Sequence, residues 1–206
     1  MPKFHLYDLL APLYGRVIPD LYNMLTFRTA KRLVAGGPSN VLEVGLGPGH
    51  ILSEVGRKAS VPLIGLDISY AMLKQARRRL KEKNITAFLV CADGTDMPFA
   101  DGSFDGVVAS FLLDLFPQAK IPGALREMAR VLAPGGRIVV ASMQFSSPFL
   151  RVVWMLAYKV MPSLVGRLRP IDFTQFLEDS GLRVLNDEVV AQGAGTRLLT
   201  LMKVRG

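Results

Sequence analysis

Three glycines at alternate positions and two nearby carboxylates are the residues of this chain with the clearest chemical meaning: Gly45, Gly47, Gly49, Glu43 and Asp67. A backbone that turns sharply from strand to helix can hold a ligand against its own N–H groups only where side chains are absent. A carboxylate at the end of the next strand can accept hydrogen bonds from both hydroxyls of a ribose. The pattern indicates a nucleotide-like ligand. The structural alternative is a tight turn that binds nothing.

The spacing of the glycines separates two classes of ligand. Dinucleotide-binding turns follow G-x-G-x-x-G, in which the third glycine lets the helix pack closely on the strand. Here His50 occupies that third position, and the glycines instead follow G-x-G-x-G. Glu43 points into the same predicted crevice, where it would repel a pyrophosphate and attract a cationic amino-acid group. These residues favour a sulfonium cofactor over NAD.

The elements that must position these residues alternate between strands and helices. Short apolar runs predict five strands, at residues 40–44, 62–66, 86–91, 104–110 and 137–142. Helical patterns lie between them at residues 50–57, 70–83 and 122–132, and Ser69 is a suitable N-cap for the second. This alternation predicts a parallel sheet with helices on both faces.

The rest of the chain has a different pattern. Residues 1–38 predict a helical cap, and residues 143–170 form an apolar insert interrupted by Pro148, Pro162 and Gly166. Residues 172–180 predict a helix that ends at Gly181. The runs 182–190 and 196–204, joined by a short glycine-containing loop, predict an antiparallel hairpin. We therefore expect one domain with a Rossmann-like, seven-stranded, mostly parallel sheet: a cofactor-binding core at 39–142 and a closing helix and hairpin at 171–206.

Composition narrows the classes of function. The chain has 206 residues, 50% of them hydrophobic, and a formal net charge of +8. It has one cysteine and two histidines, too few and too scattered for a disulfide or a metal site. The first residues lack the pattern of a signal peptide, so a cytoplasmic location is expected. No nucleic-acid-binding module is visible, and the charge fits anionic lipid, an anionic substrate or no particular partner.

Four motifs in order resemble those of class I S-adenosylmethionine-dependent methyltransferases. Residues 41–49 resemble their motif I, and residues 65–69 are similar to their ribose-binding motif. The segments 91–94, 97–99 and 103–105 resemble the adenine side of the site, and residues 130–136 resemble the lead into the fifth strand. Within the class, the chain is most similar to the UbiE-like group, which methylates quinone precursors, and to phospholipid N-methyltransferases.

The resemblance implies roles for individual residues. Glu43, Gly45 and Gly49 would line the methionine part of the cofactor, Asp67 would hold the ribose, and Asp93 would accept the adenine amino group. The remaining residues of the implied cofactor site are Tyr14, Gly47, His50, Ile68, Met72, Gly94, Ser110 and Phe111. Structural alternatives exist for several: a helix-start acid for Asp67, core packing for Ile68 and Met72, an Asp-Gly turn at Asp93 and a helix-start residue at His50.

The acceptor side is less defined. No histidine or paired carboxylate stands out as a general base, and Asp114, Tyr158 and Arg169 are the first catalytic candidates. The apolar insert is too interrupted to span a bilayer. It predicts either a lid or a mouth for a lipid or prenyl tail, with peripheral contact to an anionic membrane.

These features together predict methyl transfer to a hydrophobic or lipid-like acceptor, either a quinone precursor or a phospholipid head group. A methyltransferase acting on a soluble small molecule is the main alternative. A nicotinamide-dependent oxidoreductase and a cofactor-binding module without catalysis are less favoured. The oligomeric state is left open.

Overall fold

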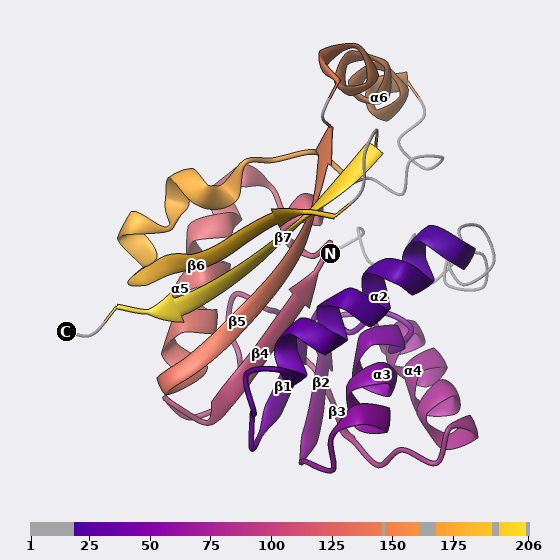
Figure 1. Ribbon diagram of the computed structural model, residues 1–206, viewed down its shortest axis with the longest axis vertical. Coiled ribbons are helices and arrows are strands. Elements are labelled where there is room, and N and C mark those ends of the chain that lie inside the picture. The colour runs from indigo at the N-terminus through magenta and orange to yellow at the C-terminus, as the bar shows by residue number, and fades with distance from the viewer. Residues whose placement is uncertain (1–18, 146, 161–167, 191–193, 205–206) are drawn as a thin grey trace.

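A seven-stranded sheet forms the centre of the computed structural model, which describes residues 19–145, 147–160, 168–190 and 194–204 (Figure 1). Its strands are β1 (Val41–Val44), β2 (Leu63–Asp67), β3 (Phe88–Cys91), β4 (Phe104–Ser110), β5 (Leu132–Phe145), β6 (Leu182–Val189) and β7 (Ala194–Lys203). Their order across the sheet is β3-β2-β1-β4-β5-β7-β6. The first five strands pair in parallel, and β7 runs antiparallel to both β5 and β6. The predicted Rossmann-like sheet with its closing hairpin is confirmed.

Helices cover both faces of this sheet. They are α2 (Pro19–Val34), α3 (His50–Lys58) and α4 (Tyr70–Glu82) on one face and α5 (Ile121–Val131) on the other, while α6 (Pro148–Val160) lies beyond the end of β5 (Figure 1). Neighbouring residues of β4 show the two-sided burial: Val107 packs in the core that contains α5, and Val108 packs in the core that contains α2, α3 and α4. Both valines are fully buried. The near-continuous apolar strands of the sequence follow from this arrangement.

The turn from β1 into α3 requires its glycines. Gly45, Gly47 and Gly49 have φ angles of 72°, 52° and 76°, a left-handed conformation that side chains disfavour. A Cβ atom at Gly45 would lie 2.7 Å from Cδ1 of Leu112, and one at Gly49 would lie 3.0 Å from Cβ of Ala76 in α4. The glycines therefore let the loop approach its neighbours and let α3 pack against α4.

One predicted helix differs in the structure. Residues 172–180 form two short 3-10 helices, η3 (Phe173–Phe176) and η4 (Glu178–Ser180), in place of one α-helix. The Asp172 side chain caps η3 by accepting the backbone N–H of Thr174, but the N–H groups of Leu177 and Ser180 donate to carbonyls three residues earlier, which is the 3-10 pattern. The predicted end at Gly181 holds, because Gly181 adopts a left-handed conformation with φ 70°.

The apolar insert contains the helix α6, which begins at Pro148, one of the three predicted interruptions. Pro148 is the first residue of α6, a position where its missing N–H costs no helical hydrogen bond. Pro162 and Gly166 lie outside the described residues, as do the helical pattern of the first eighteen residues and Tyr14. In the described part of the chain no helix has the length and apolar character needed to cross a membrane.

Candidate functional site

A cleft of about 580 Å³ opens at the carboxyl ends of β1, β2 and β4. The order of the strands reverses between β1 and β4, and ligands of open α/β sheets bind at such a point. The volume is in the range of small-molecule sites, about 300–1,000 Å³. The cleft gathers most of the predicted cofactor residues: Glu43, Gly45, Gly47, Asp67, Ile68, Met72, Asp93, Gly94, Ser110 and Phe111.

Asp67 fixes the glycine turn to the start of α4. One of its carboxylate oxygens accepts the N–H of Gly47 at 2.7 Å, and the other accepts the N–H of Ser69 at 2.9 Å. Ser69 in turn caps α4, as predicted, by accepting the N–H of Met72. Asp67 is only 9% exposed, yet it lines the cleft.

Glu43 is a buried acid beneath the glycine turn. Its side chain is 2% exposed and accepts the N–H of Leu52 at 2.8 Å, near the start of α3. Burial raises the pKa of Glu43 well above its ordinary value; the Leu52 hydrogen bond lowers it, and the negative charge of Asp67 raises it further. A cationic group in the cleft would favour the ionised form of this acid.

Asp93 follows the end of β3 and lines the same cleft. Burial raises its pKa, but hydrogen bonds from the backbone and hydroxyl of Thr95 and from Lys120 outweigh this effect, so the net shift is downward. The Thr95 bonds are 2.9 and 2.8 Å long, and Nζ of Lys120 lies 3.3 Å from the other carboxylate oxygen. Asp93 is therefore ionised and oriented at neutral pH.

Two predicted cofactor residues lie outside the lining of the cleft. Gly49 serves the packing of α3 on α4. His50 is the first residue of α3 and is half-buried. Burial and the positive charges of Arg79 and Lys83 lower the pKa of His50 to about 4, so its imidazole is neutral at pH 7.

The three catalytic candidates separate in the structure. Tyr158 of α6 and Arg169 line the cleft, and Asp114 does not. Asp114 is fully buried and accepts hydrogen bonds from the Ser142 hydroxyl at 2.8 Å and the Met143 N–H at 3.0 Å. Burial, opposed by these two bonds, raises the pKa of Asp114 to about 7.

The backbone of Asp114 is also hydrogen-bonded to the segment that carries Arg169. Its carbonyl accepts the N–H of Arg169 at 3.0 Å, and the Arg169 guanidinium donates to the carbonyl of Phe116. Asp114 therefore joins the end of β5 to the loop that carries Arg169. Asp114 thus positions other residues, and its carboxyl group does not line the cleft.

One wall of the cleft was missed from the sequence. It comes from the connection between β4 and α5, which includes η1 (Leu113–Leu115) and η2 (Gln118–Lys120), and its lining residues are Leu112, Leu115, Phe116, Pro117 and Lys120. The connection starts at Phe111, which has a left-handed φ of 53° and donates its N–H to the carbonyl of Ala141 at 2.7 Å. Non-glycine residues in this conformation are often part of functional sites. No periodic pattern in the sequence marks these residues.

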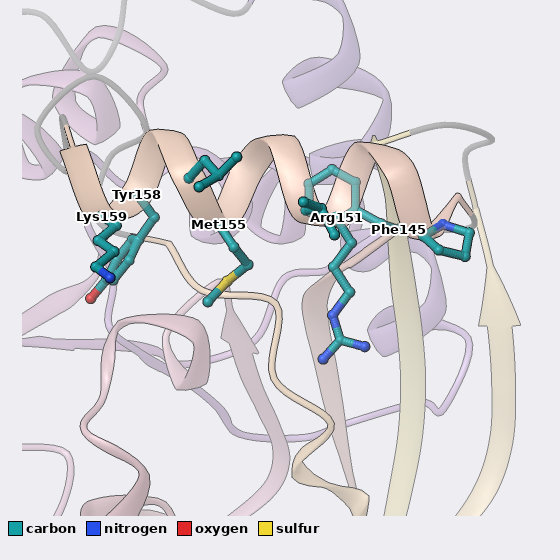
Figure 2. Close-up of a pocket in the computed structure, with 8 residues that line it drawn as sticks. Phe145, Arg151, Met155, Tyr158 and Lys159 are labelled. Carbon is teal, nitrogen blue, oxygen red and sulfur yellow. The ribbon is translucent and has the colours of Figure 1, made fainter.

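A second pocket, of about 780 Å³, lies beside α6. Figure 2 shows side chains of Arg151, Met155, Tyr158 and Lys159 extending from this helix. Phe145, Pro148, Val152 and Leu156 complete a lining that is mostly apolar. Tyr158 lines both this pocket and the cleft, so the two cavities adjoin at this residue.

Comparison with known proteins identifies the class of the site. The methyltransferase domain family matches residues 41–136. Demethylmenaquinone methyltransferase of Renibacterium salmoninarum is 35% identical over 169 residues, which cover 79% of this chain and 68% of that protein. The ubiquinone/menaquinone biosynthesis C-methyltransferase UbiE of Geobacter sp. is 32% identical, over 77% of this chain and 69% of that protein. This chain belongs to the UbiE-like methyltransferases. It is an enzyme that uses S-adenosylmethionine, as predicted, and the nicotinamide alternative is not favoured.

Solved structures agree at the level of the fold. The [4+2]-cyclase SpnF superposes with a TM-score of 0.78 at 22% identity, over 98% of this UbiE-like chain and 96% of SpnF. Magnesium protoporphyrin IX methyltransferase of Synechocystis PCC 6803, solved with bound S-adenosylhomocysteine, superposes with a TM-score of 0.73 at 15% identity. The match covers 98% of this chain and 94% of that protein. Because one of these neighbours is a cyclase, the fold leaves the acceptor open.

Proposed function

We propose that this methyltransferase transfers a methyl group to a ring carbon of a hydrophobic quinone precursor. The names of its relatives support a quinone precursor and a carbon acceptor. The observation that carries the proposal in this chain is the apolar pocket that adjoins the cleft at Tyr158. A ring placed in the cleft could extend an apolar tail past Tyr158, between Met155 and Leu156.

The residues of the cleft fit S-adenosylmethionine in charge and in shape. Gly45 and Gly47 leave bare backbone, and a Cβ atom at Gly47 would meet nothing within 4 Å, so space is open there. We assign the cationic amino-acid end to Glu43, the ribose hydroxyls to Asp67 and the adenine amino group to Asp93. When bound, the cofactor supplies a methyl group that its sulfonium already activates.

The protein itself must orient the acceptor and exclude water. Tyr158 and Arg169 are polar residues that line the cleft, and Tyr158 also lines the second pocket. A ring carbon becomes a better nucleophile when a neighbouring ring hydroxyl ionises, and the positive charge of Arg169 would stabilise that ionised form. We therefore assign Arg169 to the acceptor hydroxyl and Tyr158 to the face of the acceptor ring. The cytoplasmic location expected from the sequence stays a prediction.

Transfer of a labelled methyl group tests this proposal. The acceptors are a reduced demethylmenaquinone with a prenyl tail, the same ring without the tail, phosphatidylethanolamine and a small soluble amine. We expect label on a ring carbon of the first, with a higher KM for the ring without its tail. Label on phosphatidylethanolamine or on the amine, with none on either ring, would refute the proposal.

A substitution in the second pocket tests whether this pocket holds the apolar tail of the acceptor. Met155→Glu places a charge in the apolar pocket and should raise the KM of the tailed acceptor by about tenfold, the effect of losing roughly 1.4 kcal/mol of apolar burial. The KM of the ring without a tail and the affinity for S-adenosylmethionine serve as internal controls, and both should stay unchanged. Equal losses for both acceptors would show that the pocket does not hold the tail.

A further inference from the structure

One face of α6 is apolar and exposed to solvent. Phe149, Val153, Leu156 and Val160 are spaced by four, three and four residues, so they share one side of the helix. Their exposed fractions are 73%, 47%, 58% and 73%. A helix of a globular protein normally turns its apolar stripe toward the core, so this stripe needs another explanation.

The opposite side of α6 holds the helix to the rest of the protein. The indole N–H of Trp154 donates to the carbonyl of Leu168 at 3.0 Å, and its ring lies 5.5 Å from the ring of Phe145 at the end of β5. Tyr158, one turn further, lines the cleft. In Figure 1, α6 lies beyond the end of β5, away from the central sheet. The orientation of the helix is thus fixed by one side, and the apolar stripe faces outward.

Charge distinguishes between the partners that could cover this stripe. The charged residues of α6 are Lys159, which lies beside the stripe next to Leu156 and Val160, and Arg151, which lies on the Tyr158 side; the helix contains no acid. The whole chain carries a net charge of +8. A second copy of the chain would bring like charges together, whereas an anionic lipid surface attracts Lys and Arg and accepts apolar side chains beneath its head groups.

We propose that α6 docks flat on the surface of an anionic lipid bilayer. Its 13 residues measure about 20 Å, shorter than the roughly 30 Å hydrocarbon core, so the helix lies in the interface and does not cross it. Leu156 belongs both to the exposed stripe and to the lining of the second pocket. If the proposed acceptor is correct, docking therefore sets the tail pocket beside the membrane that holds the acceptor. The docking itself does not depend on the reaction.

Vesicle flotation tests the docking without any methyl transfer. The full chain is mixed with vesicles of equal parts phosphatidylglycerol and phosphatidylcholine, and with vesicles of phosphatidylcholine alone. We expect binding to the anionic vesicles, weakened by salt, and at least about tenfold weaker binding for the double variant Phe149→Ser/Val153→Ser, from the apolar area removed. Neither residue lines the cleft or the pocket.

The matched control is Phe88→Ser. Phe88 is 72% exposed, close to the 73% of Phe149, but it lies on the edge strand β3. This variant should float like the wild type. Circular dichroism and unchanged affinity for S-adenosylmethionine establish that the variants fold. Equal flotation of the double variant and the wild type, no flotation on either vesicle, or a solution dimer that the double variant dissociates would each overturn the proposal.

Discussion

Replacing Asp67 with alanine should weaken binding of S-adenosylmethionine more than it weakens the fold. The carboxylate lines the cleft and is 9% exposed, so its bonds to a ribose would form with little competition from water. A hydrogen bond to a charged group contributes about 1.5–3 kcal/mol, and the loss of one such bond predicts a Kd roughly 10- to 150-fold higher. The variant also releases the N–H of Gly47, which loosens the glycine turn.

Asp105→Ala provides the matched control for this prediction. The Asp105 carboxylate also accepts backbone N–H groups, those of Ser39 and Asn40, but it lies outside the lining of the cleft. We expect Asp105→Ala to lower the melting temperature and to leave the Kd of S-adenosylmethionine unchanged. Isothermal titration calorimetry gives both Kd values. If the two variants change the Kd equally, or Asp67→Ala leaves it unchanged, Asp67 does not bind the cofactor.

Three further substitutions test other parts of the site. Gly49→Ala should destabilise the fold by about 1–3 kcal/mol in denaturant titrations, because of its left-handed φ and its approach to Ala76; an unchanged midpoint would contradict this. Glu43→Gln should weaken binding of S-adenosylmethionine by about tenfold in calorimetry through loss of a buried charge, and unchanged affinity would remove Glu43 from the site. The pKa of Asp114 is raised from 3.8 to about 7, so the folded protein binds more protons and this group makes stability fall as pH rises through that window. The free energy of unfolding of the wild type should therefore fall by roughly 2–4 kcal/mol between these pH values, and Asp114→Asn should lack this fall. Denaturant titrations at several pH values measure it, and identical pH profiles for the two proteins would refute the prediction.

The strands and the glycine turn could be predicted because their determinants are local. Buried parallel strands such as Val41–Val44 appear as short apolar runs, and the left-handed turn that follows requires residues without side chains. Asp67 and Asp93 could be expected at one edge because the carboxyl ends of parallel strands meet there. The place of the cleft therefore followed from the order of the motifs.

The parts that were missed depend on contacts between distant residues. The wall formed by Phe116 and Lys120 has no repeating pattern, and its place follows from the strained turn at Phe111 and from the bond between Phe116 and Arg169. The outward face of α6 could not be deduced either, because an apolar stripe normally indicates the buried side. The contacts of Trp154 with Leu168 and Phe145 show which side of the helix is anchored.

The most direct test of this account is a calorimetric comparison of three ligands on the wild-type chain. S-adenosylmethionine, S-adenosylhomocysteine and NAD are titrated separately, and each is then titrated in the presence of the others. We expect the first two to bind one site competitively and NAD to release no heat of binding. Binding of NAD without binding of S-adenosylmethionine would contradict the assignment of the cleft formed by Glu43, Asp67 and Asp93.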